Sequence, residues 1–187
     1  MAVSQSPESI EFAAERGYPM LQATTATLAN IKKKFAYYRE CAARAGHDVT
    51  NVPLPVTRAI NVAENGDEAR AEMTEPLEWY LGYARQVGLP ATDRGDRVFD
   101  EAYKHWKDTR GAFKLDPTEV AENLGIIGSA DECGAKLQTL RSELGLNYLN
   151  CAFGVGGAPQ ERILRSMRLF AERVMPQFRS APAEVGV

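Results

Sequence analysis

The chain has 187 residues, of which 44% are hydrophobic and 25% are charged, and its formal net charge is −3. This length suits a single domain with a buried core, and the lack of surplus basic residues excludes a protein that binds nucleic acid by neutralising its phosphates. No apolar stretch approaches the roughly 20 residues needed to cross a bilayer, so we expect no membrane segment. The cysteines are few and far apart, and there are two histidines, which predicts reduced thiols, a cytoplasmic protein and no metal site. The cysteines are Cys41, Cys133 and Cys151.

The first predicted helix begins at Pro7, after a strand remnant at residues 2–4. Proline suits the first helical position because its missing N–H costs nothing there. Ser6 then becomes the N-cap, and Ser9 lies at the third helical position. Two interpretations remain open from this segment alone. It is either an ordinary capped helix or an anion site, in which amides, the helix dipole and two hydroxyls hold a phosphate.

Short apolar strands and amphipathic helices then alternate, and glycines or capping residues separate them. The expected elements are a strand over 18–23, a helix from Thr25 or Thr27 to about Ala45, a strand over 56–63, a charged helix from Asp67 toward Arg85 that is interrupted or bent at Pro76, a helix capped by Ser129 and Glu132 that ends near Leu144, a strand over 147–154 and a helix over 158–174. Glycines and prolines interrupt residues 87–122, which predicts an irregular helical insertion, and residues 177–187 are predicted to be a tail.

This alternation predicts an α/β fold with parallel βα units in one domain over residues 1–187. Only three complete strands are expected, and so few parallel strands cannot close into a barrel. The sheet would therefore have open edges at residues 2–4 and 147–152. We expect self-association, or pairing with another chain, through these edges.

Five stretches together resemble one protein family: SQSPESIEFAAERGYPML, YYRECAARAGHDVTNV, VTRAINVAENGDEARAE, IIGSADECGAKLQTLRSELGLNYLNCAFG and ILRSMRLFAERVMPQF. In this order they resemble the bacterial luciferase-like, flavin-dependent monooxygenases over nearly the whole chain. The resemblance implies the C-terminal half of a (β/α)8 TIM-type barrel. It also implies FMN as the cofactor, with a deazaflavin as the other option, and a flavin reductase that supplies reduced flavin. The implied reaction uses O2 to oxygenate a small organic substrate such as an aldehyde or ketone. The alternative is a non-catalytic flavin-binding or assembly module.

The resemblance also implies which residues touch the cofactor. Ser6 and Ser9 match positions that receive the FMN phosphate, and Gln5 matches a position beside the cofactor. Gln22 and Thr24 match positions that face the isoalloxazine ring. The catalytic histidine of the family has no counterpart in this chain, so no catalytic residue is predicted. The two histidines, His47 and His105, are expected to be a surface and a half-buried side chain, respectively. The GVGG stretch is expected to be a turn between a strand and a helix.

Overall fold

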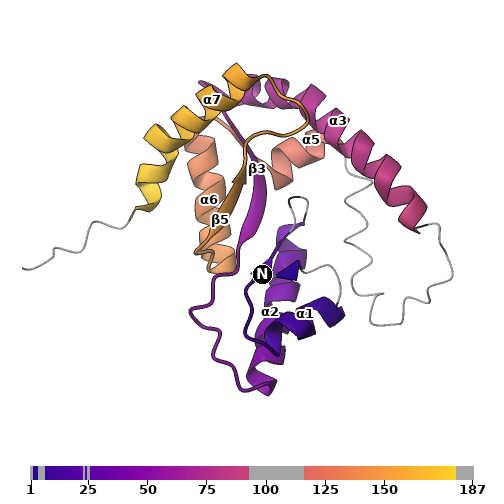
Figure 1. Ribbon diagram of the computed structural model, residues 1–187. Helices are drawn as coiled ribbons and strands as arrows, with labels where there is room; N and C mark the ends of the chain where they lie inside the picture. The colour runs from indigo at the N-terminus through magenta and orange to yellow at the C-terminus, as the bar shows by residue number, and fades with distance from the viewer. Residues whose placement is uncertain (1, 4–6, 23, 25, 93–115, 180–187) are drawn as a thin grey trace, which may run out of the picture.

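The computed structural model describes residues 2–3, 7–22, 24, 26–92 and 116–179. Its central element is the strand β3 (Val56–Val62), shown in Figure 1. Two strands flank β3 in parallel, in the order β4-β3-β5. They are β4 (Ile126–Gly128) and β5 (Leu149–Ala152). β5 pairs with the first half of β3 and β4 with the second half. Nearly all of β3 is buried, as expected for a parallel strand that is covered on both faces.

A second, two-stranded sheet consists of β1 (Ala2–Val3) and β2 (Met20–Leu21), which are also parallel. The two sheets meet where Gln22, directly after β2, forms a single bridge with Val56 of β3. The Gln22 N–H donates to the Pro55 carbonyl at 2.9 Å, and the Thr57 N–H donates back to the Gln22 carbonyl at 3.1 Å. The backbone of β3 therefore contacts Gln22 and then β4 along one edge, and β5 along the other.

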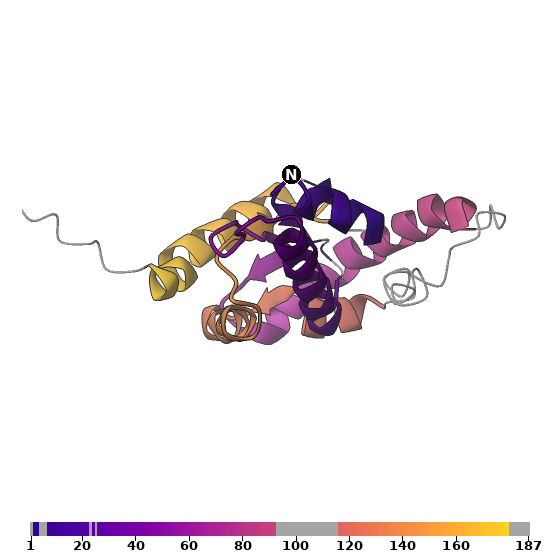
Figure 2. The ribbon, with the colours of Figure 1, turned by 90° about the horizontal axis from the view of Figure 1, so that it is seen from below.

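The helices fall into two groups in Figures 1 and 2. Helices α1 and α2 pack together beside the start of β3, whereas α3, α6 and α7 surround the three-stranded sheet. The bounds are α1 (Pro7–Ala14), α2 (Leu28–Arg44), α3 (Gly66–Thr92), α5 (Pro117–Glu119), the π-helical turn η2 (Val120–Leu124), α6 (Ala130–Leu144), α7 (Gln160–Leu169), η3 (Phe170–Val174) and η4 (Met175–Phe178).

The two faces of β3 belong to two apolar clusters. Val56, Ile60 and Val62 join the larger cluster with residues of α1, α2, α6 and η3. Ala59 lies on the opposite face, in a smaller cluster beneath α3. Alternation along the strand explains this division, because successive side chains point to opposite faces. Small residues on the second face let α3 approach closely.

Several local predictions are confirmed. α1 begins at Pro7, and the Thr27 hydroxyl accepts the Asn30 N–H at the start of α2. Ser129 and Glu132 form the expected capping box of α6. That helix ends at Gly145, which has φ of 63°. A left-handed residue at this place favours glycine, which has no Cβ to clash.

Other elements differ from the prediction. β4 was not predicted as a strand, because two isoleucines and a glycine between Gly125 and Ser129 show no measurable periodicity. α3 continues through Pro76 and ends at Thr92, beyond the expected end at Arg85. The first six residues of the predicted 87–122 insertion therefore extend α3, and residues 93–115 lie outside the described part of the chain. The expected strand over 18–23 is regular only at Met20–Leu21, and the predicted tail begins inside η4.

Candidate functional site

The carboxyl end of the β1–β2 pair brings together the two groups of predicted cofactor residues. Ala2 is level with Met20, and Val3 is level with Leu21. Because the strands are parallel, the chain leaves both at the same end. From β1 it passes to the start of α1, and from β2 it passes to Gln22. Ligands in parallel α/β proteins bind at this end of the strands.

The first of these groups lies at the start of α1. Pro7 is buried, Ser9 is half-buried in the first turn, and Glu8 beside it is exposed. An anion at this place would meet the positive end of an eight-residue helix. Two residues of the predicted site, Gln5 and Ser6, lie outside the described residues.

Contacts with α2 fix the orientation of α1. The Tyr37 hydroxyl donates to the Glu11 carboxylate, and this bond is the first cause that raises the Tyr37 pKa. The Tyr38 hydroxyl donates to the Tyr18 carbonyl at 2.9 Å, just after the helix. His47 Nε2 lies 2.8 Å from the Glu15 carbonyl oxygen and is exposed, as expected.

The second group consists of Gln22 and Thr24. Gln22 is fully buried, and its backbone is part of the sheet through the bridge to β3. Thr24 is half-buried in the turn that follows. Its carbonyl accepts a hydrogen bond from Arg58 Nη1 at 3.0 Å. Backbone pairing with β3 therefore holds Gln22. A hydrogen bond from the Arg58 side chain holds Thr24.

Arg58 is a buried charge that the sequence analysis did not single out. It is 2% exposed, and its Nη2 donates to the Ala26 carbonyl at 2.8 Å. Burial lowers the pKa of its guanidinium to about 10, which leaves it charged at neutral pH. The signal in the sequence was an arginine within an apolar strand, since arginine is rarely buried without partners.

A polar cluster at the other end of β3 was also missed. Asn61 Nδ2 donates to Glu72 Oε2 and to the Ala69 carbonyl, both at 3.0 Å. Arg165 of α7 also binds the Glu72 carboxylate. Burial favours the protonated acid, but the hydrogen bonds from Arg165 and Asn61 outweigh it and lower the Glu72 pKa. This cluster joins α3 and α7 across the end of the strand. Both Asn61 and Arg165 bind the same carboxylate, which is typical of a structural role.

The GVGG stretch forms a turn between β5 and α7, as predicted. Gly156 has φ of 60°, and a Cβ there would lie 1.8 Å from the Pro76 carbonyl oxygen. The loop therefore packs directly against α3, and only glycine allows this approach. The loop and Gln22 lie at different levels along β3. The carboxyl end of β5 is level with Ala59, whereas Gln22 bridges to Val56, which is three residues or about 10 Å earlier along the strand.

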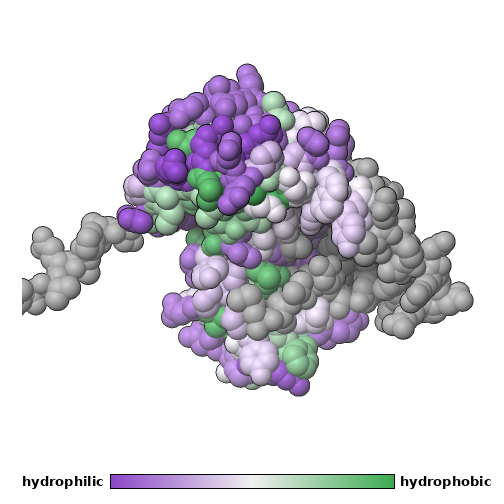
Figure 3. Space-filling model, turned by 45° about the horizontal axis from the view of Figure 1, so that its top comes forward, coloured by the Kyte–Doolittle hydropathy of each residue, from purple (hydrophilic) through white to green (hydrophobic). Residues whose placement is uncertain are grey.

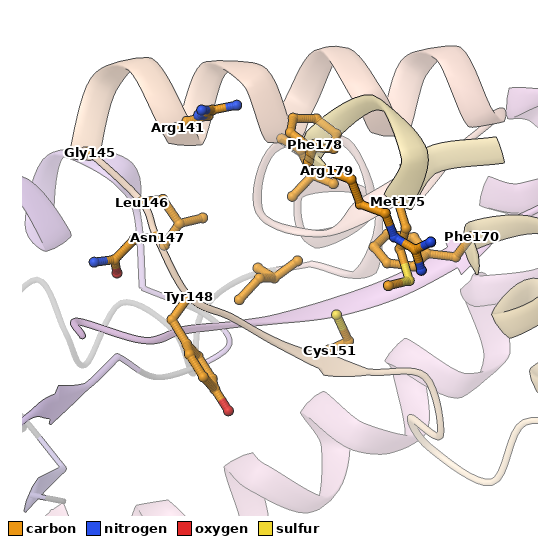
Figure 4. Close-up of a pocket in the computed structure, with 12 residues that line it drawn as sticks. Arg141, Gly145, Leu146, Asn147, Tyr148, Cys151, Phe170, Met175, Phe178 and Arg179 are labelled. Atoms are coloured by element: carbon orange, nitrogen blue, oxygen red, sulfur yellow. The ribbon is translucent and has the colours of Figure 1, made fainter. Parts of the chain in front are cut away.

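A cavity of about 700 Å³ opens beside β5, at the end away from this loop (Figure 4). Its walls are mainly apolar side chains of α6, the α6–β5 connection and the last helical turns, with Arg141 and Arg179 among them. In Figure 4 the Tyr148 ring points away from the cluster formed by Phe170, Met175 and Phe178. Apolar surface is also visible below the hydrophilic upper face in Figure 3. The cavity lies apart from Gln22 and Thr24, which are absent from its lining.

The three thiols differ in their surroundings, and Arg44 Nη2 lies 3.0 Å from Cys41 Sγ. Cys41 and Cys133 are buried, Cys151 is half-buried, and all three are free. Burial raises the pKa of the Cys133 thiol to about 12.

Among the described residues, no group of three histidine, cysteine or acidic side chains is arranged to hold a metal ion. None of the described helices has the length and apolarity required to cross a membrane. His105 lies outside the described residues.

Comparisons with known proteins agree on one family. A family model described as luciferase-like monooxygenase matches residues 1–148. The alkanal monooxygenase alpha chain of Photobacterium leiognathi is 27% identical over 180 residues, which cover 94% of this chain and 51% of the relative. The chain thus spans about half the length of the curated relatives it matches.

Solved structures show the same fold. The oxygenating constituent of 3,6-diketocamphane monooxygenase from Pseudomonas putida, in complex with FMN, aligns with a TM-score of 0.63 and 22% identity, over 94% of this chain and 47% of its own. The coenzyme F420 dependent tetrahydromethanopterin reductase from Methanopyrus kandleri aligns with a TM-score of 0.62 and 17% identity, over 95% of this chain and 50% of its own. The predicted α/β class with parallel βα units is confirmed.

Proposed function

Because the chain belongs to the luciferase-like monooxygenase family, we propose that it holds FMN and takes part in a flavin-dependent oxygenation. The substrate would be a small organic molecule such as an aldehyde or ketone, and O2 would be the second substrate. The main support is the register of β1 and β2, which gives the start of α1 and the Gln22–Thr24 segment a common end. If β1 and β2 were antiparallel, the residues matched to the phosphate and to the ring would lie at opposite ends of the pair.

The residues present fit a flavin phosphate and ring. Ser6 and Ser9 would hold the phosphate at the positive end of α1, and Gln5 would lie beside the cofactor. Gln22 and Thr24 would lie along the ring, where the buried Gln22 would offer an amide as a polar contact. When bound, the reduced flavin supplies the electrons that activate O2. The chain's own tasks are to orient the cofactor and to exclude water from it.

A deazaflavin is the second candidate for the cofactor. The observation that favours it is the fold shared with the coenzyme F420 dependent reductase. Coenzyme F420 is a deazaflavin, and a chain that uses it would transfer hydride instead of activating O2. Titration with FMN and with F420 under identical conditions separates the two, because a genuine FMN site will prefer FMN.

We also propose that the chain works together with another polypeptide or a second copy, because β5 pairs with β3 alone among the described strands. A separate flavin reductase would supply reduced flavin. The three free thiols suit the reducing cytoplasm.

The phosphate site is tested by replacing Ser6 and Ser9 together with alanine. Loss of hydrogen bonds to a charged phosphate should weaken FMN binding by about 1–3 kcal/mol. Riboflavin lacks the phosphate, so its binding should not change. Ser142→Ala, at an exposed serine of α6, is the matched control. Equal weakening of FMN and riboflavin would disprove the phosphate role.

The alternative function is a flavin-binding or assembly module without oxygenase chemistry. Consumption of O2 with reduced FMN and a panel of aldehydes and ketones decides between them. Substrate-dependent consumption supports the monooxygenase, and flavin binding without it supports the module.

A further inference from the structure

Strand pairing between β2 and β3 ends at an unusual place. Gln22 exchanges backbone hydrogen bonds with Pro55 and Thr57, and its bridge is isolated. In a parallel ladder such bonds recur every second residue. The next rung would therefore involve the carbonyl oxygens of Thr24 and Thr57, with the backbone amides as donors. The chain instead turns at Thr24.

The side chain of Arg58 lies where that rung would be. Its Nη1 is 3.0 Å from the Thr24 oxygen and 3.2 Å from the Thr57 oxygen. Its Nη2 is 2.8 Å from the Ala26 oxygen, two residues further along the turn. One buried guanidinium thus replaces backbone amides as the donor to both sides of the interrupted ladder.

We propose that Arg58 is a positioning residue for the cofactor site, because its guanidinium fixes where the chain leaves β2 and so places Thr24 relative to Gln22. The proposal rests on the proposed function, since Gln22 and Thr24 are the residues assigned to the flavin ring. Arg58 acts through the backbone of this segment and is not assigned a contact with the flavin.

The geometry requires a charged donor with several N–H groups. A planar guanidinium can serve diverging carbonyl oxygens at once, whereas a lysine has one nitrogen on a flexible stem. Arg58 also lines a small cavity of about 150 Å³ together with Glu122 and Lys136. Among the residues that line this cavity, these two are the other charged groups, so any test by pH must account for them.

Lys136 provides a matched control. Its Nζ also donates to three backbone carbonyl oxygens, those of Ala121, Gly125 and Ile127. It lines the same cavity, but it holds η2 and β4 and not the segment after β2. Lys136→Met therefore removes the same kind of interaction from a different part of the chain.

The experiment compares Arg58→Met, Arg58→Lys, Lys136→Met and the wild type in the full chain. Hydrogen exchange of the amides in residues 22–28 is measured without ligand, with α7 as the internal reference. FMN and riboflavin are then titrated into each protein. Arg58→Met should speed exchange in 22–28 and weaken both ligands alike, by about tenfold, because a shifted segment misplaces the ring contacts. Lys136→Met should alter exchange near residues 120–127 and leave both affinities unchanged.

Arg58→Lys adds a readout that a merely structural role would not move. Burial lowers the pKa of a lysine strongly, so the variant should be charged at pH 6 and lose charge by pH 8.5. At pH 6 it should lie between the wild type and Arg58→Met, in both protection and affinity, because one ammonium nitrogen replaces two guanidinium nitrogens. At pH 8.5 it should match Arg58→Met. The wild type should not change between these pH values, because its guanidinium stays charged.

Unchanged or slower exchange of 22–28 in Arg58→Met would overturn the proposal, because the segment would then keep its place without the guanidinium. A pH profile of Arg58→Lys equal to that of the wild type would overturn it too. If Arg58→Met does not fold, Arg58→Lys at the two pH values decides. Altered exchange in a chain that binds neither FMN nor riboflavin would support anchoring by Arg58 and overturn the flavin function.

Discussion

Charged side chains hold both ends of β3, but they do so in opposite ways. At the start, the Arg58 guanidinium is bound by backbone carbonyls of its own strand and of the segment after β2. At the end, the Glu72 carboxylate is bound by Asn61 and by Arg165 of α7, with Arg162 Nε at 4.0 Å. The first end has one multivalent donor, and the second has several donors for one acid.

This difference teaches where the fold depends on a single residue. If one partner of Glu72 is lost, others remain near it, and Arg165 still has Glu68 at 3.5 Å. If Arg58 is lost, several carbonyls lose a donor at the same time. The end that carries the predicted cofactor segment is therefore the more vulnerable one.

The largest expected effect on stability follows from this asymmetry. Arg58→Met should lower the free energy of unfolding by about 3 kcal/mol, because the carbonyls of Thr24 and Ala26 lose their charged donor. Urea denaturation of the variant and the wild type measures the difference. A loss below about 1 kcal/mol would show that water or other donors replace the guanidinium.

At the opposite end of β3, Glu72→Gln should cost less, about 1–2 kcal/mol, because the amide oxygen still accepts from Asn61. The cost should depend on pH. The Glu72 pKa is lowered in the folded chain from its ordinary value of 4.5. Its contribution is therefore fully present above pH 4.5 and is lost as the pH falls through the folded pKa.

Urea denaturation at pH 7 and at several acidic pH values tests this sign. The difference between wild type and Glu72→Gln should shrink toward zero with acid. A difference that stays constant with pH would mean that the cost comes from packing and not from charge.

Ser166→Ala should have a smaller effect, about 1 kcal/mol. The Ser166 hydroxyl accepts the Val62 N–H at 2.8 Å, beyond the place where β5 ends. The Ser166 hydroxyl of α7 thus accepts a backbone hydrogen bond from β3 where no residue of β5 is paired with the strand. Thermal unfolding, with Ser142→Ala as the exposed control, should show a clear decrease for Ser166→Ala only.

The same contrast explains what sequence reasoning can and cannot predict. Caps such as Thr27 and Ser129 are local, because their partners lie three residues away. The predictions for both were therefore sound. Arg58 and Glu72 bind partners that are distant in sequence, and no local pattern contains that information. The register that joins Val3 to Leu21 is equally non-local. The cofactor residues came from the family resemblance, and two of them, Gln5 and Ser6, lie outside the described residues.

Substitutions at the outer edge of β5 are expected to change the stability of the folded chain least. Among the described strands, β5 pairs with β3 alone. Its residues, Leu149–Ala152, carry no charge, and the neighbouring Tyr148 ring is 54% exposed. Uncharged open edges tend to pair with other chains. We therefore expect self-association at micromolar concentration, measured by sedimentation velocity.

Tyr148→Lys should reduce this self-association without loss of stability, because lysine blocks edge pairing. Tyr18→Lys, at a tyrosine that is 48% exposed on the α1 side, is the matched control and should leave association unchanged. A wild-type chain that stays monomeric and binds no hydrophobic dye would contradict this prediction, since its open edge and apolar cavity would then be covered within one chain.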